Sequence, residues 1–274
     1  YWKAPSAGSQ NVLARFGDAG KVAAECDVTV AVLGINKSIE REGQDRFSLE
    51  LPVDQQEFIK ELYKVNPNTV VVLVAGSSMA VNWMDENVPA ILNAWYPGEQ
   101  GGNAVAEVLF GDYNPGGRLP LTYYNSLDEI PAFDNYFVKG RTYQYFEGQP
   151  LYEFGYGLSY TKFRYKSKGV NVEQDTVKVS FEVSNTGKYD GDEVTQVYVK
   201  YPETGTYMPL KQLHGFKRVH IKKGKTSKVT IGVPKKDLRY WDEQERKFVT
   251  PKGEYTFMVG ASSDDIKFRE TVGL

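Results

Sequence analysis

The pattern of apolar and polar residues changes once along the chain. In the first part, short apolar runs at 27–34, 69–75 and 90–95 predict three buried strands, and the first two runs are rich in β-branched residues. Between the first two runs, residues 51–65 place their apolar side chains on one helical face and carry a proline in the first turn. Strands that alternate with helices predict a parallel α/β layer with right-handed crossovers.

From about residue 163 onward the apolar residues recur with a period of two. Residues 177–183 and 193–199 alternate cleanly between apolar and polar side chains, and further candidate strands lie at 215–221, 227–233 and 254–259. Turn residues separate these runs. About seven short strands at this spacing predict an immunoglobulin-like β-sandwich.

The length of 274 residues favours two domains. The expected fold class is therefore α/β plus all-β: a partial parallel α/β sandwich layer over 1–125, an irregular linker over 126–172 and a β-sandwich over 173–274. Residues 1–16 have no clear period and predict a loop, and residues 19–26 predict a helix. Because a parallel sheet is usually built as strand, crossover and strand, this early helix leads us to expect a strand upstream of the given sequence.

The densest group of chemically versatile side chains follows the first predicted strand. Residues 39–46 carry three carboxylates, two guanidinium groups and a glycine. The second predicted strand is followed by the loop Gly76-Ser77-Ser78, and the third is followed by the glycine-rich stretch 96–102. Parallel strands bring their carboxyl ends to one edge of the sheet, where ligands of open α/β sheets bind. The sequence thus predicts a site on this edge, although a charge-rich loop is more often a solvated surface.

Composition excludes several kinds of chemistry. Cys26 is the only cysteine, so no internal disulfide can form, and His214 and His220 are the only histidines. Neither a metal-ligand spacing nor a Ser-His-Asp arrangement is present, and we expect no metal and no other cofactor. The aromatic fraction of 14% is high and fits either sugar-facing surfaces or a β-rich core.

Charge and hydropathy narrow the range of partners. The net charge of −2 combines an acidic excess in the first 160 residues with a basic excess in the rest. The basic side chains are scattered among strand patterns without a recognition helix or an RNA-binding motif, so we expect no nucleic acid partner. The apolar run at 70–75 is far shorter than the roughly 20 residues of a membrane span, so we expect no membrane partner.

Four ordered motifs, together with the sequence of the β domain, resemble glycoside hydrolase family 3. The motifs are Glu42-Gly43-Gln44-Asp45-Arg46, Trp95-Tyr96-Pro97-Gly98-Glu99-Gln100-Gly101-Gly102, Gly116-Gly117-Arg118-Leu119-Pro120 and Phe154-Gly155-Tyr156-Gly157-Leu158-Ser159-Tyr160. The region from about 175 to 274, which includes Leu213-His214-Gly215-Phe216-Lys217-Arg218-Val219, is similar to the fibronectin type III-like C-terminal domain of that family.

The resemblance implies a retaining β-glycosidase. Such enzymes need two carboxyl groups about 5–5.5 Å apart, a nucleophile and a general acid/base. In this family an N-terminal barrel supplies the nucleophile, and a loop of the α/β domain supplies the acid/base. The Glu-Gly-x-Asp-Arg pattern assigns the acid/base to Glu42, with Glu40 as runner-up because the surrounding Glu-x-Glu permits a shifted alignment. Asp45 and Arg46 are predicted to bind substrate, and their charges would act on Glu42 in opposite directions.

The nucleophile motif of the barrel is absent from the given sequence. We therefore expect the C-terminal portion of a larger, secreted or periplasmic hydrolase, inactive without its N-terminal barrel. The expected substrates are oligosaccharides or glycosides with terminal β-linked glucose or xylose, and residues 39–46 favour the β-xylosidase branch. The alternative is a non-catalytic carbohydrate-binding or scaffold protein of the same descent. The retained acidic loop distinguishes the two, because a scaffold has no need of Glu42 or Asp45.

Overall fold

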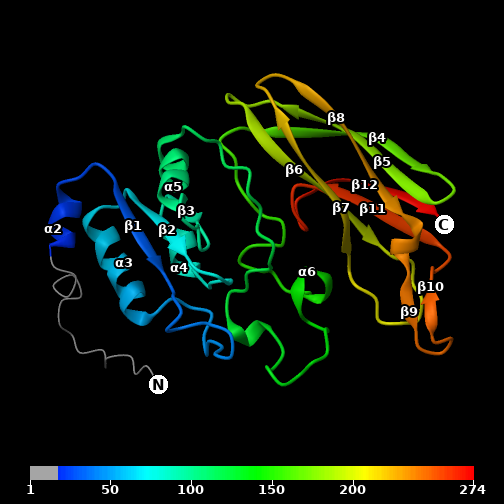
Figure 1. The fold of residues 1–274 in the computed structure, drawn as a ribbon, viewed down its shortest axis with the longest axis horizontal. Helices are drawn as coiled ribbons and strands as arrows, with labels where there is room; N and C mark the ends of the chain where they lie inside the picture. The colour runs from blue at the N-terminus through cyan, green and yellow to red at the C-terminus, as the bar shows by residue number, and fades with distance from the viewer. Residues whose placement is uncertain (1–17) are drawn as a thin grey trace. The chain divides into compact units, whose positions relative to one another are not determined.

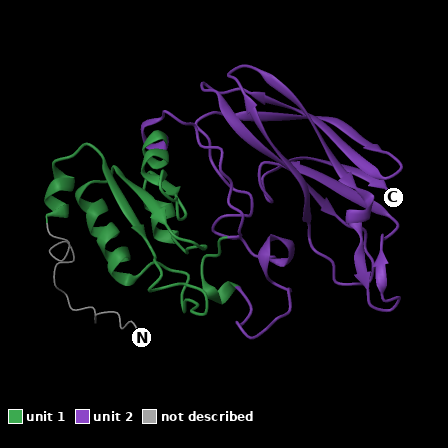
Figure 2. Cartoon of the chain, viewed as in Figure 1, with its two compact units in different colours: residues 1–107, 123–129 green, residues 108–122, 130–274 purple. Residues whose placement is uncertain are grey.

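The computed structural model describes residues 18–274. The chain divides into two compact units, which Figure 2 shows in green and purple. Unit 1 comprises residues 1–107 and 123–129, and unit 2 comprises residues 108–122 and 130–274. The loop predicted for residues 1–16 lies outside the described residues.

Unit 1 contains a three-stranded parallel sheet in the order β1-β2-β3 (Figure 1). Val30 of β1 lies opposite Val70 of β2, and Val71 lies opposite Ile91 of β3. The predicted α/β layer is thus confirmed. Its strands are β1 (Thr29–Gly34), β2 (Thr69–Val74) and β3 (Ala90–Asn93), and its helices are α2 (Ala19–Ala24), α3 (Val53–Val65), α4 (Asn82–Asn87), α5 (Gly101–Phe110, whose last turn falls in unit 2) and the short η1 (Leu127–Glu129).

Two backbone features fix where the strands end. At Gly34, a Cβ atom would lie 1.8 Å from the carbonyl oxygen of Val74, so only glycine allows β1 and β2 to approach this closely. The Gln55 side chain completes this end of β1, since it accepts a hydrogen bond from the Gly34 N–H and donates one to the Gly34 carbonyl, both 2.8 Å long. Strand β3 stops two residues before its predicted end because Trp95 has a φ of 54°, outside the range of extended backbone.

Unit 2 contains a four-stranded antiparallel sheet in the order β12-β11-β6-β7 and a three-stranded antiparallel sheet in the order β4-β5-β8. The predicted β-sandwich is thus confirmed. Its strands are β4 (Phe163–Val172), β5 (Thr176–Asn185), β6 (Gly191–Lys200), β7 (Gln212–Ile221), β8 (Thr226–Pro234), β11 (Glu254–Gly260) and β12 (Ile266–Gly273), with the small hairpin β9 (Tyr240–Asp242) and β10 (Lys247–Val249) and the helices α6 (Thr142–Tyr145) and η2 (Lys235–Leu238). Residues 163–172, which the predicted division placed in the linker, pair with β5 as strand β4.

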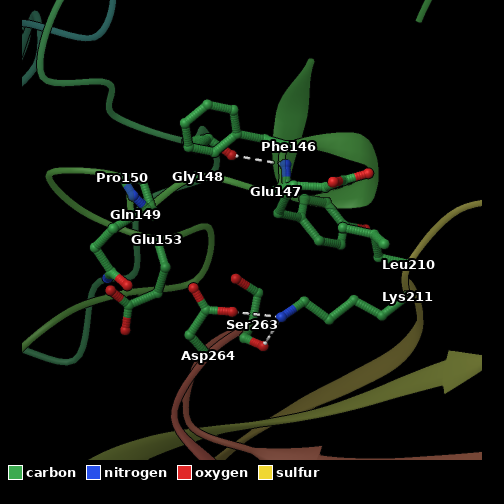
Figure 3. A pocket seen from close by; sticks show the side chains of 12 residues that line it. Phe146, Glu147, Gly148, Gln149, Pro150, Glu153, Leu210, Lys211, Ser263 and Asp264 are labelled. Atoms are coloured by element: carbon green, nitrogen blue, oxygen red, sulfur yellow. Dashed lines mark hydrogen bonds and ion pairs between the residues drawn. The ribbon is translucent and has the colours of Figure 1, made fainter. Parts of the chain in front are cut away.

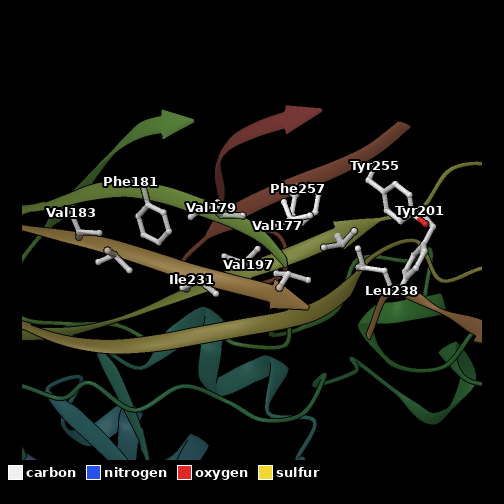
Figure 4. Close-up of a cluster of buried hydrophobic side chains, with 14 of the residues drawn as sticks. Val177, Val179, Phe181, Val183, Val197, Tyr201, Ile231, Leu238, Tyr255 and Phe257 are labelled. Atoms are coloured by element: carbon white, nitrogen blue, oxygen red, sulfur yellow. The ribbon is translucent and has the colours of Figure 1, made fainter. Parts of the chain in front are cut away.

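The core of the sandwich follows directly from the period of two. Successive inward positions of β5, namely Val177, Val179, Phe181 and Val183, are all at most 1% exposed. They meet apolar side chains of β6, β8 and β11 in one cluster (Figure 4). Burying each such side chain contributes about 1.5–3 kcal/mol, so the alternation visible in the sequence is what drives the two sheets together.

The outer face of β6 is covered as well, by the segment 142–157 that precedes the sandwich. The buried Gln196 side chain donates hydrogen bonds to the carbonyl oxygens of Gly155 (3.2 Å) and Ala261 (2.5 Å), and it accepts one from the Tyr198 hydroxyl (2.5 Å). The Tyr143 ring packs edge-on against Tyr198, with ring centroids 5.7 Å apart. Residues 195–199 are therefore buried without a break, where strict alternation predicts only every second residue.

Substituting Gly155 with alanine should lower the free energy of unfolding by about 2–3 kcal/mol. Gly155 has a φ of 83°, and a Cβ atom there would lie 2.2 Å from the Gln196 side-chain oxygen. The change therefore strains the backbone and displaces the buried amide. Urea unfolding of the 274-residue chain measures the loss. Gly117→Ala is the matched control, because its Cβ would meet no atom within 4 Å, and equal losses in the two variants would contradict this explanation.

Candidate functional site

The charged loop after β1 carries a tight turn at its tip. Arg41 and Gln44 exchange two backbone hydrogen bonds of 3.2 and 2.9 Å, which leaves Glu42 and Gly43 at the turn itself. Gly43 has a φ of 74°, a conformation that glycine adopts without strain. The Glu42 side chain is exposed, and so is that of Asp45. Neither carboxylate forms a hydrogen bond or ion pair with another described residue, so both are available to a molecule outside unit 1.

The base of this loop is held by the guanidinium group of Arg46. Its Nε atom lies 2.6 Å from the Glu40 carboxylate, and its Nη2 atom donates to the Ser77 hydroxyl (2.8 Å) and to the Ser78 carbonyl (2.7 Å). The Ser77 hydroxyl in turn donates to Glu40 over 2.5 Å. Only 9% of the Arg46 side chain and 25% of the Glu40 side chain are exposed, so this contact is largely shielded from solvent.

The structure thus brings together two loops that the sequence placed on one edge of the sheet. Arg46 and Glu40 come from the loop after β1, and Ser77 and Ser78 come from the loop after β2. The remaining Arg46 nitrogen, Nη1, donates to the Leu49 carbonyl (3.4 Å) and to the Met79 sulfur (3.0 Å). All three nitrogen atoms of Arg46 are therefore engaged within the protein, whereas Glu42 and Asp45 stand outside this network.

Tyr123 is a member of this region that the sequence did not single out. It belongs to the segment 123–129 of unit 1 and is only 2% exposed. Its hydroxyl oxygen accepts a hydrogen bond of 2.9 Å from the side chain of Asn93, which lies at the end of β3. Burial raises the pKa of Tyr123 to about 12, although the Asn93 hydrogen bond and the Arg46 charge both lower it. Tyr123 is therefore a neutral phenol at physiological pH. The signal available in the sequence was a tyrosine inside an otherwise irregular stretch, which is too common to single out.

In the described part of the chain, neither a candidate metal centre nor a membrane-spanning helix is found. Among residues 18–274, no group of three or more His, Cys, Asp or Glu side chains is placed to hold a metal ion. No helix in the same range is long and apolar enough to cross a membrane.

Comparison with known proteins finds two matching domain families. Residues 3–160 match the glycosyl hydrolase family 3 C-terminal domain, and residues 193–263 match the fibronectin type III-like domain. The first match contains the Arg46 network and the Glu42 turn, and the second covers much of the β-sandwich.

Individual relatives carry the names of glycosidases. The chain is 42% identical over 225 residues to a xylan 1,4-beta-xylosidase of Xylanibacter ruminicola, a match that covers 81% of this chain and 26% of the relative. It is 38% identical over 264 residues to a beta-glucosidase of Kluyveromyces marxianus, covering 91% of this chain and 31% of the relative. It is 34% identical over 270 residues to a periplasmic beta-glucosidase of Salmonella typhimurium, and this match covers 93% of this chain and 35% of the relative. The chain thus spans about a third of the length of these relatives.

Solved structures agree with the sequence matches. The crystal structure of the Kluyveromyces marxianus beta-glucosidase in complex with glucose is similar over 97% of this chain and 34% of its own, with a TM-score of 0.90 and 35% identity. The beta-glucosidase of Bifidobacterium adolescentis is similar over 100% of this chain and 42% of its own, with a TM-score of 0.89 and 31% identity.

Proposed function

The chain belongs to glycoside hydrolase family 3, and from this premise we propose that it is the C-terminal portion of a retaining β-glycosidase. Its part in the reaction is the general acid/base, supplied by Glu42 from the loop after β1. The second carboxylate, the nucleophile, comes from an N-terminal barrel. The proposed substrates are oligosaccharides and glycosides that carry terminal, non-reducing β-linked glucose or xylose.

One observation carries the assignment to Glu42. A general acid must lie within hydrogen-bond reach of the leaving oxygen, so its carboxyl group has to be free to meet the substrate. Glu42 stands exposed at the tip of a turn whose base is fixed, whereas Glu40 accepts hydrogen bonds from Arg46 and Ser77 inside unit 1. This difference favours Glu42 over Glu40, the alternative that the Glu-x-Glu pattern left open.

The same contacts change the role we propose for Arg46. Substrate binding requires a free donor, and all three nitrogen atoms of Arg46 already donate to partners in unit 1. We therefore propose that Arg46 positions the loop, with Glu40 and Ser77 as its partners. Asp45 is exposed and keeps its proposed place beside the substrate.

The sugar and the location are proposed from the relatives. Their names include both a xylosidase and glucosidases, so the enzyme is proposed to accept xylose or glucose at the non-reducing end. The name of the Salmonella typhimurium relative supports export to the periplasm or beyond the cell. Rates on matched aryl xylosides and aryl glucosides would decide between the two sugars.

If the two catalytic carboxylates come from two different domains, the isolated chain should not hydrolyse glycosides. The purified 274-residue chain, incubated with nitrophenyl β-glucoside or β-xyloside, should release no nitrophenol above the uncatalysed rate, because one of two required carboxylates is missing. The full-length enzyme should release it, and proton NMR should find the first sugar product in the β configuration. Hydrolysis by the isolated chain, or an α product from the full-length enzyme, would contradict the proposal.

A further inference from the structure

A pocket of about 380 Å³ lies within unit 2. Its walls come from Thr122, from residues 143–153 of the segment that precedes the sandwich, from residues 210–211 before β7, and from residues 263–264 after β11 (Figure 3). The volume is at the lower end of the range of small-molecule sites, which is roughly 300–1,000 Å³.

Hydrogen bonds fix these walls to one another before any ligand arrives. The Leu210 N–H donates to the Gln144 carbonyl (2.7 Å), and the Ser263 N–H donates to the Phe154 carbonyl (2.8 Å). The Lys211 ammonium group donates to the Ser263 carbonyl (2.6 Å) and pairs with the Asp264 carboxylate, as Figure 3 shows. A ligand would therefore find a preformed site and would lose little affinity to the ordering of loops.

The lining combines an apolar wall with an excess of acceptors. Phe146 and Pro150 supply apolar surface, and Glu147 and Glu153 supply carboxylates in addition to that of Asp264. The single ammonium group of the lining, on Lys211, is already engaged by Asp264. Three carboxylates repel phosphates and carboxylic acids, so an anionic ligand is disfavoured.

Two of the polar groups still lack a partner among the residues that the structure describes. The Ser263 hydroxyl is buried and unpaired there, and Ser263 is only 1% exposed. A buried hydroxyl without a partner costs free energy, which a hydrogen-bonding ligand or a bound water would recover. The exposed Glu147 carboxylate likewise forms no hydrogen bond or ion pair with another described residue. Of these two groups, the exposed Glu147 carboxylate is the one that can accept hydrogen bonds from the hydroxyl groups of a ligand.

We propose that this pocket binds a neutral sugar of one or two rings. A pyranose presents an apolar ring face, which fits the Phe146 and Pro150 wall, and several hydroxyl donors, which fit the carboxylates. Its lack of negative charge fits the acidic lining. All residues that line the pocket belong to unit 2, so this proposal does not rest on the assignment of Glu42.

Titration of the isotope-labelled 274-residue chain with cellobiose and with xylobiose, followed by NMR, tests the proposal. At least one of the two should cause saturable shift changes in residues 143–153 and 263–264. Glucuronate, an anionic sugar, should cause none at the same concentrations. The proposal is overturned if neither disaccharide gives saturable changes there, or if glucuronate binds as tightly as the neutral sugar.

Matched variants locate the site. Phe146→Ala should weaken binding by about tenfold because it removes the apolar wall. Glu147→Gln should weaken it by about fivefold, since a neutral amide replaces a charge-assisted acceptor. Glu147 forms no hydrogen bond or ion pair with another residue of the range 18–274 that this change would break. Phe216→Ala, on an exposed ring of β7 outside the pocket, is the control and should leave binding unchanged. Unchanged binding in the Glu147 variant would overturn the proposal, even if Phe146→Ala fails to fold.

Discussion

Replacing Arg118 with methionine should lower the free energy of unfolding by about 3–5 kcal/mol, because it leaves a buried carboxylate without its counter-ion. The Arg118 Nη2 atom donates to Glu193 over 2.7 Å, and the two side chains are 8% and 3% exposed. The other Glu193 oxygen accepts a hydrogen bond from the Tyr165 hydroxyl (2.6 Å), which cannot neutralise the charge. Urea unfolding of the 274-residue chain, followed by circular dichroism, measures the loss.

The loss should grow as the pH rises. Burial raises the pKa of Glu193 above its ordinary value of 4.5, while the charge of Arg118 and the hydrogen bonds from Tyr165 and Arg118 lower it. Removing Arg118 raises this pKa further. The folded variant therefore holds the Glu193 proton to a higher pH than the wild type does. Its free energy of unfolding, relative to that of the wild type, should fall as the pH rises above 4.5, the ordinary pKa of a glutamate. A deficit that is the same at pH 4.5 and at neutral pH would contradict this cause.

A second substitution separates charge from packing. Adding Glu193→Gln to Arg118→Met should restore part of the lost stability, because a neutral amide needs no counter-ion and can still accept the Tyr165 hydrogen bond. Arg164→Met is the matched control. Arg164 is an exposed side chain on β4, and its loss should change stability by no more than about 0.5 kcal/mol. If the double variant is no more stable than Arg118→Met, the buried charge is not the cause.

The β-sandwich could be predicted from sequence because apolar core residues alternate with polar residues along its strands. Val177, Val179, Phe181 and Val183 stand two residues apart, and all of them are buried. The three parallel strands of unit 1 were predictable for a similar reason, since each is a short, mainly apolar run that ends before a loop. Both signals arise from neighbours along the chain and need no knowledge of the tertiary fold.

The contacts that fix the two polar networks could not be predicted in this way. Arg46 and Ser77 belong to loops after different strands, and Arg118 and Glu193 are far apart in the sequence. A parallel sheet predicts that the first two loops share an edge, but no local rule says which side chains will meet there. Gln196 illustrates the same limit, because its burial depends on the segment 142–157 that covers the outer face of β6.

In the full-length enzyme, Glu42→Gln should slow the hydrolysis of glycosides with poor leaving groups by about 10²–10⁴-fold, because a departing alkoxide needs a proton donor. Release of nitrophenol in the first turnover should be spared, since nitrophenolate departs without one. The same residue then acts as the base that activates water, so later turnovers should be slow. Azide needs no base, and adding it to Glu42→Ala should restore turnover of the aryl glycoside and yield a glycosyl azide. Stopped-flow kinetics and product analysis measure both effects.

Glu40→Gln is the matched comparison, because it removes the other carboxylate of the Glu-x-Glu pair. Glu40 contacts Arg46 and Ser77 at the base of the loop, so its substitution should loosen the turn that carries Glu42. The Glu42 carboxyl group is still present in this variant, so the loss on poor leaving groups should be smaller than in Glu42→Gln, and the first-turnover release of nitrophenol should again be spared. Azide should not accelerate Glu40→Ala, because Glu42 can still act as the base that activates water. If azide instead rescues Glu40→Ala and leaves Glu42→Ala unchanged, the acid is Glu40, and the exposed turn has a different role.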